Sequence, residues 1–98
     1  MFYTLTTLHS RGVAMAESIL HSVGLRIRDL RKAKGLSQEQ LGEKAGFHYS
    51  YIGGIERAEK NISLMNLAKV AEALDVHVYE LFVYNRLRKS LTSKEKEN

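Results

Sequence analysis

The side chains best suited to specific hydrogen bonding gather between residues 48 and 57. A helix over this stretch would place Tyr49 and Ser50 on an outer face that ends at Arg57. A serine hydroxyl can donate to or accept from a base or a phosphate, and a tyrosine such as Tyr49 or Tyr51 can contact either. No nucleophile is paired with a base anywhere in the chain, and no carboxylate pair occupies an apolar setting. The residues therefore favour binding over catalysis, and we do not expect an enzyme.

Residues 37–57 have the pattern of two short helices joined by a glycine turn. Ser37 is expected to cap the first helix, with Gln40 completing a capping box. Gly46 stands where the chain must turn sharply, and glycine takes a positive φ at little cost. The pattern predicts a helix-turn-helix, which places its second helix in the major groove of DNA. Gln38, at the start of the first helix, is then expected to hold a phosphate against free backbone amides.

Glycines inside the two helices need a separate explanation. Gly53 and Gly54 lie within the predicted second helix, where each costs about 1 kcal/mol relative to alanine. We expect them on its exposed face, where a backbone, either of a neighbouring helix or of a DNA strand, approaches closely. Gly42 is expected where the two helices cross at short range.

Apolar spacing predicts three more helices, over about 17–34, over about 64–74, and from residue 78 onward, where the last can extend to Leu91. Gly35 is expected to end the first and Ser63 to cap the next. The residues expected to face the core are Leu20, Val23, Ile27, Leu30, Leu41, Ala45, Ile52, Ile55, Leu64, Leu67, Val70, Ala71 and Leu74, with Tyr51 partly buried. Five helices without a strand signal predict a compact all-α domain.

Composition sets the limits of what the chain can do. Its 98 residues suffice for one domain, and the absence of cysteine excludes disulfides and thiolate metal sites. The four histidines share no ligand spacing, so neither a metal site nor a cofactor is expected. No apolar run is long enough for a membrane span, and the first residues make a poor signal peptide. These features predict a soluble, cytoplasmic protein with no evident small-molecule ligand.

The net charge of +4 is distributed unevenly along the chain. Residues 22–82 hold nine Lys or Arg and eight Asp or Glu, whereas residues 83–98 hold five and two. The basic character therefore comes mostly from the end of the chain and says little about nucleic acid by itself. We expect a flexible N-terminal extension over 1–16, a helix-turn-helix domain over 17–84, and a basic, partly disordered tail over 85–98.

About 60 of the 98 residues, from 23 to 82, resemble the lambda-repressor-like, Xre-type DNA-binding domain. Residues 51–57 are similar to the controller proteins of restriction–modification systems, which are small homodimers that regulate their own gene and the endonuclease gene. The matching residues are Ile27, Leu30, Arg31, Gly35, Leu36, Ser37, Gln38, Leu41, Gly42, Gly46, Tyr51, Ile52, Ile55, Glu56, Arg57, Leu74 and Val76.

The resemblance implies roles for particular residues. Arg31 and Glu56 would form a partly buried ion pair between the first and third helices, and Gln38 would hold a phosphate. His48 is expected to cap the third helix or lie at its surface. The full set of DNA-binding candidates is Gln38, His48, Tyr49, Ser50, Tyr51, Gly54, Arg57, Asn61 and Ser63, of which Tyr49, Ser50 and Gly54 would face bases and Tyr51, Arg57, Asn61 and Ser63 the DNA backbone.

These inferences predict a sequence-specific transcriptional regulator, active as a homodimer on an inverted repeat with half-sites about 10 bp apart. Autoregulation and control of a restriction–modification system follow from the resemblance. The apolar residues expected at the dimer interface are Val76, Val78, Tyr79 and Phe82. The alternative is an antitoxin or a phage-repressor-like regulator whose domain also binds a partner protein, and gene neighbours would distinguish the two.

Overall fold

The computed structural model describes residues 19–83, which form helices and no strand. The first helix covers residues 19–33 of this range. It is followed by α2 (Gln38–Ala45), α3 (Tyr49–Glu56), α4 (Leu64–Ala73) and a short 3-10 helix, η1 (Val78–Phe82). The predicted all-α fold is confirmed. The extension expected over 1–16 and the tail expected over 85–98 lie outside the described residues.

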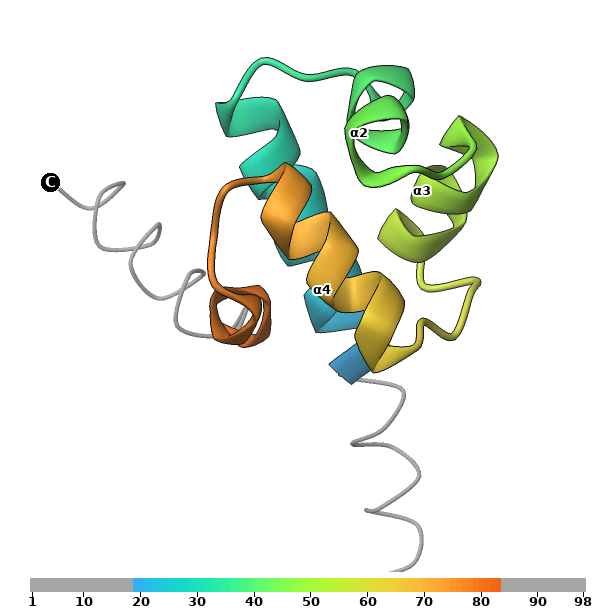
Figure 1. The fold of residues 1–98 in the computed structure, drawn as a ribbon. Coiled ribbons are helices and arrows are strands. Elements are labelled where there is room, and N and C mark those ends of the chain that lie inside the picture. The colour runs from blue at the N-terminus through green and yellow to red at the C-terminus, as the bar shows by residue number, and fades with distance from the viewer. Residues whose placement is uncertain (1–18, 84–98) are drawn as a thin grey trace, which may run out of the picture.

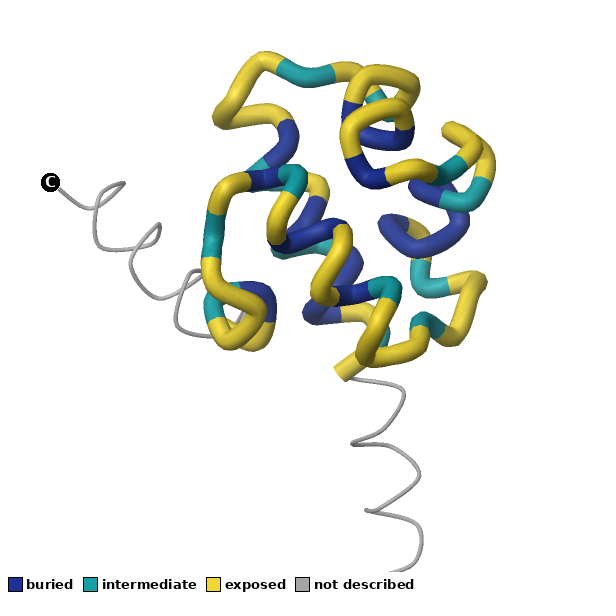
Figure 2. The backbone as a smooth tube through the Cα atoms, viewed as in Figure 1, coloured by how far each residue is buried: buried dark blue, intermediate teal, exposed yellow. Residues whose placement is uncertain are grey.

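The helices enclose one core. In Figure 1, α2 and α3 lie next to each other, and the chain turns back after α4 to form η1. Helix α4 contacts both α2 and η1. Buried segments of every helix face inward in Figure 2, while the outer turns are exposed. The fully enclosed apolar side chains are Val23, Ile27, Leu41, Ala45, Ile52, Ile55, Leu67, Val70, Ala71, Leu74 and Leu81. Leu20, Leu30 and Tyr51 are half-buried at its edge.

The helix ends follow the predicted local signals. The Gln40 amide donates to the Ser37 hydroxyl over 3.0 Å, and the Ser37 amide donates to the Gln40 side chain over 2.8 Å, so the capping box is complete. Gly46 ends α2 in the left-handed region with a φ of 83°. The Ser63 hydroxyl accepts from the amide of Asn66 over 3.1 Å at the start of α4. Ser37 and Gly46 thus fix the start and the end of α2, and Ser63 fixes the start of α4.

The prediction that Leu64 faces the core is wrong, because its side chain is 76% exposed. Leu64 is the first residue of α4, and it borders an open groove of about 320 Å³ that Ile19 and Phe82 also line. Leu67, one turn further along the same helix, is buried. The apolar stripe of α4 therefore extends one turn beyond the core that the described residues fill.

The fifth predicted helix is a 3-10 helix of five residues as far as the structure describes it. Leu81 is its buried residue. Two hydrogen bonds of Glu80 hold the segment: its backbone oxygen accepts from Arg26 Nε over 3.0 Å, and its carboxylate accepts from the His77 amide over 2.7 Å. Its expected continuation towards Leu91 lies outside the described residues. Among residues 19–83, no helix is long and apolar enough to cross a membrane.

Candidate nucleic-acid interface

The start of α3 presents an exposed group of polar and aromatic side chains, which are those of His48, Tyr49 and Ser50. His48 is the N-cap, as expected, and its Nδ1 accepts from the Ser50 amide over 3.2 Å. The same nitrogen lies 2.7 Å from the Ser50 hydroxyl oxygen. In a neutral ring the accepting nitrogen carries no proton, so the hydroxyl can donate to it and keep its lone pairs for an incoming donor.

Tyr49 and Tyr51 lie on different sides of α3. The Tyr49 side chain is 49% exposed, and its ring centre is 4.6 Å from that of His48. Tyr51 is half-buried, its hydroxyl accepts from Asn66 Nδ2 over 3.1 Å, and its ring meets Phe47 edge-on at 5.0 Å. Tyr49 is therefore available at the surface, whereas Tyr51 connects α3 to α4.

Arg31 and Glu56 form a buried ion pair between the first helix and α3. The Arg31 guanidinium donates through Nε over 2.6 Å and through Nη2 over 3.0 Å to the two carboxylate oxygens. The side chains are only 9% and 3% exposed. Arg31 Nη1 also donates to the Leu36 carbonyl over 2.8 Å, and Gln38 Nε2 donates to Glu56 over 3.1 Å. This network joins the first helix, the turn before α2, the start of α2, and the end of α3.

The exposure predicted for Gly53 and Gly54 is wrong, because both residues are buried. Side chains cover them: those of Arg57 and Gln38 lie over Gly53, and that of Lys60 lies over Gly54. A Cβ atom at Gly53 would lie 2.9 Å from Arg57 Nη1, and one at Gly54 would lie 2.7 Å from Lys60 Cγ. Gly54 was implied as a base-facing position, and in this structure the Lys60 side chain lies over it.

Two other glycines allow backbones to come close together. A Cβ atom at Gly42 would collide with the Phe47 carbonyl oxygen, so the contact predicted there is made with the turn that leads into α3. A Cβ atom at Gly24 would lie 2.5 Å from the Ile55 carbonyl oxygen. The sequence analysis missed Gly24, although a glycine in the middle of a helix is itself a signal of close packing. The first helix and α2 thus each place a glycine against backbone at one end of α3.

Arg57 lies just after α3, with its guanidinium held by a neighbouring carboxylate. Its Nε and Nη2 donate to the two oxygens of Glu59 over 3.0 and 3.1 Å, and both side chains are more than half exposed. The bond and the charge of Glu59 raise the pKa of Arg57, and the same contact with Arg57 lowers the pKa of Glu59. Sequence reasoning did not identify this pair.

A polar recess of about 220 Å³ lies between α2, the first helix and the end of α3. Its lining combines the buried network with two further arginines, and consists of Arg28, Arg31, Gln38, Glu56 and Arg57. Asn61 and Ser63 are exposed on the loop that follows, although the Ser63 hydroxyl also caps α4. The structure thus brings Gln38 and Arg57 together and adds Arg28, which the sequence analysis did not select.

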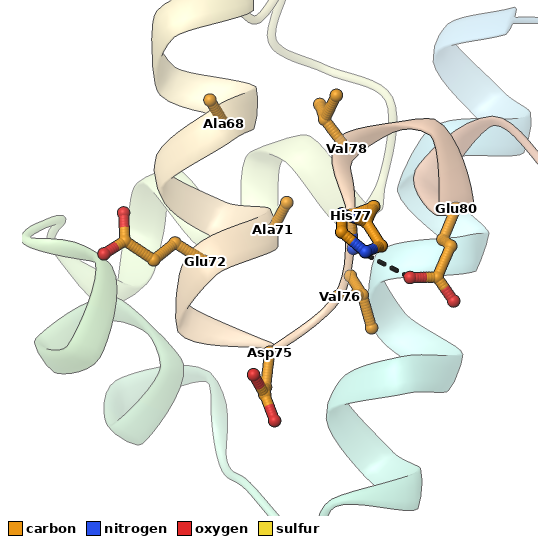
Figure 3. Close-up of a pocket in the computed structure, with 8 residues that line it drawn as sticks. All are labelled: Ala68, Ala71, Glu72, Asp75, Val76, His77, Val78 and Glu80. Carbon is orange, nitrogen blue, oxygen red and sulfur yellow. Dashed lines mark hydrogen bonds between the residues drawn. The ribbon is translucent and has the colours of Figure 1, made fainter.

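Three of the predicted dimer residues lie in η1, and Val76 lies just before it. Tyr79 is 65% exposed, and Val78 and Phe82 are also exposed, whereas Val76 is half-buried against the core. Val76 and Val78 line a recess of about 400 Å³ that Figure 3 shows, with the carboxylates of Glu72, Asp75 and Glu80 around its edge. No group of three or more His, Cys, Asp or Glu side chains within residues 19–83 is arranged to hold a metal ion.

Known proteins resemble this domain both in amino-acid sequence and in the arrangement of its helices. The helix-turn-helix family matches residues 27–81. Control protein C.SmaI of Serratia marcescens is 42% identical over 62 residues, which is 63% of this chain and 74% of that protein. The regulator SinR of Bacillus subtilis is 47% identical over 60 residues, so the chain spans about half of that relative, 54% of its length.

Two solved structures extend the comparison. The restriction–modification controller protein C.AhdI from Aeromonas hydrophila superposes with a TM-score of 0.63 at 52% identity, over 64% of this chain and 96% of that chain. SinR in complex with DNA superposes with a TM-score of 0.58 at 47% identity, over 60% of this chain and 95% of that chain. The predicted resemblance is confirmed: this chain belongs to the helix-turn-helix family and is similar to Xre-type regulators and restriction–modification controller proteins.

Proposed function

We propose that this protein is a sequence-specific DNA-binding transcriptional regulator that acts as a homodimer on an inverted-repeat operator. We further propose that it regulates its own gene and controls a restriction–modification system. The observation that carries the proposal is the exposed start of α3 in a fold that is shared with a regulator solved in complex with DNA. A cytoplasmic location is part of the proposal, because the operator would be there.

In this proposal α3 enters the major groove with its first turn towards the bases. Ser50 carries the direct contact, since its hydroxyl can donate to His48 and still accept from a base amino group. Tyr49 is exposed beside it and can pack against a thymine methyl group. With so few base-reading side chains, DNA shape contributes the rest of the specificity.

Phosphate contacts orient the motif on the duplex. The free amides at the start of α2 lie next to Gln38, whose side chain is fixed by its bond to Glu56. Arg57 supplies a full positive charge close to Gln38, and Asn61 and Ser63 offer exposed polar groups on the loop beyond. These contacts carry affinity without sequence information, so they should respond strongly to salt.

Dimerisation is proposed through the exposed apolar side chains of η1. Val78, Tyr79 and Phe82 are all exposed within the five residues of η1, which supports their burial in a second copy. A two-fold dimer would place two α3 helices in neighbouring major grooves, with half-site centres about 10 bp apart. Sedimentation of the full chain across a concentration range measures the association directly.

The test of the function is binding of the purified chain to its own upstream DNA and to a scrambled duplex, each at two salt concentrations. We expect a preference for the upstream fragment that survives the higher salt and rises steeply with protein concentration. Ser50→Ala should reduce that preference while leaving binding to the scrambled duplex nearly unchanged. Equal, salt-sensitive binding to both fragments would refute the proposal and favour a partner-protein role.

A further inference from the structure

The ion pair between Arg57 and Glu59 lies on the surface that is proposed to meet DNA. It joins two residues that are two apart in the turn after α3, and their side chains are 58% and 57% exposed. An ion pair this open to water contributes little to stability, because each charge is well solvated without the other. Another anion of suitable shape can therefore replace Glu59 at small cost.

Arg57 is already oriented towards the recess between α3 and the start of α2. Its Nη1 atom lies over Gly53, where a Cβ atom would be 2.9 Å away, and the Gln38 side chain covers the same position at 3.3 Å. Gly53 thus leaves room for the guanidinium to lie along α3 beside Gln38. A larger residue at position 53 would displace it.

The edge of Arg57 that binds Glu59 is one that could bind a phosphate. Its Nε and Nη2 atoms face two carboxylate oxygens at 3.0 and 3.1 Å. A guanidinium presents its donors as a rigid planar fork that fits two oxygens of a carboxylate or of a phosphate equally well. One edge cannot bind both partners in this way at the same time.

We propose that Glu59 is an internal competitor of the DNA phosphate for Arg57, and that it lowers the affinity of the protein for all DNA sequences. This inference rests on the proposed DNA-binding function. On binding, a backbone phosphate takes the edge of Arg57 that Glu59 occupies in the free protein, and the carboxylate returns to solvent. Base contacts made by the start of α3 are unaffected.

The consequence is weaker binding to every duplex by a similar factor. Phosphate contacts make up most of the affinity for non-specific DNA, whereas base contacts add only at the operator. Residues 22–82 hold nine Lys or Arg and eight Asp or Glu, so the domain has little net positive charge to attract DNA. A competing carboxylate at Arg57 therefore leaves non-specific binding weak in absolute terms, so that occupancy at low protein concentration requires the added contacts of Ser50 and Tyr49.

The test is a double-mutant cycle measured by DNA titration with the full chain. The variants are Glu59→Gln, Arg57→Ala and the two combined, on the upstream and scrambled duplexes at several salt concentrations. Glu43→Gln is the matched control, because it removes the same charge from an exposed residue of α2. Melting curves establish that each variant is folded, which is expected since Glu59 and Arg57 are exposed.

We expect Glu59→Gln to tighten binding roughly two- to five-fold per bound protomer on both duplexes, and to steepen the salt dependence by up to about one unit of slope. The gain should disappear when Arg57 is alanine. The change in DNA affinity caused by Glu43→Gln should be the same in the wild-type protein and in the Arg57→Ala variant.

Three results would overturn the inference while leaving the function intact. Weaker binding by Glu59→Gln would mean that the carboxylate orients Arg57 for DNA, and unchanged binding would mean that the carboxylate does not compete with the phosphate. An equal gain in the Arg57→Ala background would mean simple charge repulsion without competition. Wild-type protein that binds neither duplex is a different result, because it would refute the DNA-binding function and the inference together.

Discussion

Glu56→Gln should destabilise this domain far more than its single-atom change suggests. The substitution keeps one oxygen and replaces the other with an amide nitrogen that cannot accept from Arg31. At best it loses one of the charge-assisted bonds, which span 2.6 and 3.0 Å, and it leaves the guanidinium unpaired at 9% exposure. The remaining donor from Arg31 goes to the Leu36 carbonyl, which cannot neutralise the charge.

The magnitude follows from these contacts. A hydrogen bond to a charged group contributes about 1.5–3 kcal/mol, and removing one partner of a buried pair costs about 3–5 kcal/mol. Because glutamine retains one acceptor, we expect a loss of about 2–4 kcal/mol of unfolding free energy. For a domain of this size, that loss lowers the melting temperature by roughly 8 °C or more.

Urea and thermal denaturation followed by circular dichroism measure this change. Glu43→Gln is the control, since an exposed carboxylate without a buried partner should change stability by no more than about 0.5 kcal/mol. If Glu56→Gln does not fold, Arg31→Lys provides an intermediate case that keeps the charge but loses the two-pronged contact. A Glu56→Gln variant as stable as the control would refute the reasoning, because the pair would then behave as a surface pair.

Two backbone predictions use the same denaturation assay. Gly24→Ala should cost about 1–3 kcal/mol, because the new Cβ atom would meet the Ile55 carbonyl oxygen at 2.5 Å; a stabilised variant would show that the first helix can shift away from α3. Ala58→Gly should stabilise by about 0.5–1 kcal/mol, because Ala58 holds a φ of 60° that glycine takes freely. Asp75→Gly, at a φ of 58°, is the comparison and should gain less, since aspartate tolerates this region better than alanine. Equal gains at the two positions would contradict that explanation.

Local signals predicted the helices and their ends, because those signals act between residues close in sequence. The capping box of Ser37 and the left-handed turn at Gly46 each depend on a few neighbouring residues, and both are present in the structure. The buried apolar side chains of α2 and α3, which are Leu41, Ala45, Ile52 and Ile55, followed from apolar spacing in the same way. The pairing of Arg31 with Glu56 came from family resemblance, since no local pattern joins residues 25 apart.

Contacts that depend on how the helices are assembled were the ones missed. Spacing placed Leu64 on the apolar side of α4 but could not show that the core begins only one turn later, at Leu67. Composition could not show which side chains cover Gly53 and Gly54, and these glycines were therefore assigned to an exposed face. The contact of Arg57 with Glu59 joins residues two apart. It depends on the turn after α3, in which the Glu59 amide donates to the Gly54 carbonyl of the helix.

The stability of α3 must come from its surroundings. A helix of eight residues with two internal glycines is marginal by itself, because nucleation is costly and each glycine adds to the cost. It is held at its start by the His48 cap and the close approach at Gly42, and at its end by the Arg31–Glu56 pair and the close approach at Gly24. Substitutions at these supports should therefore weaken folding and DNA binding together. Substitutions of the exposed Ser50 should weaken operator preference alone, and this separation of effects distinguishes a residue that contacts DNA from one that positions the helix.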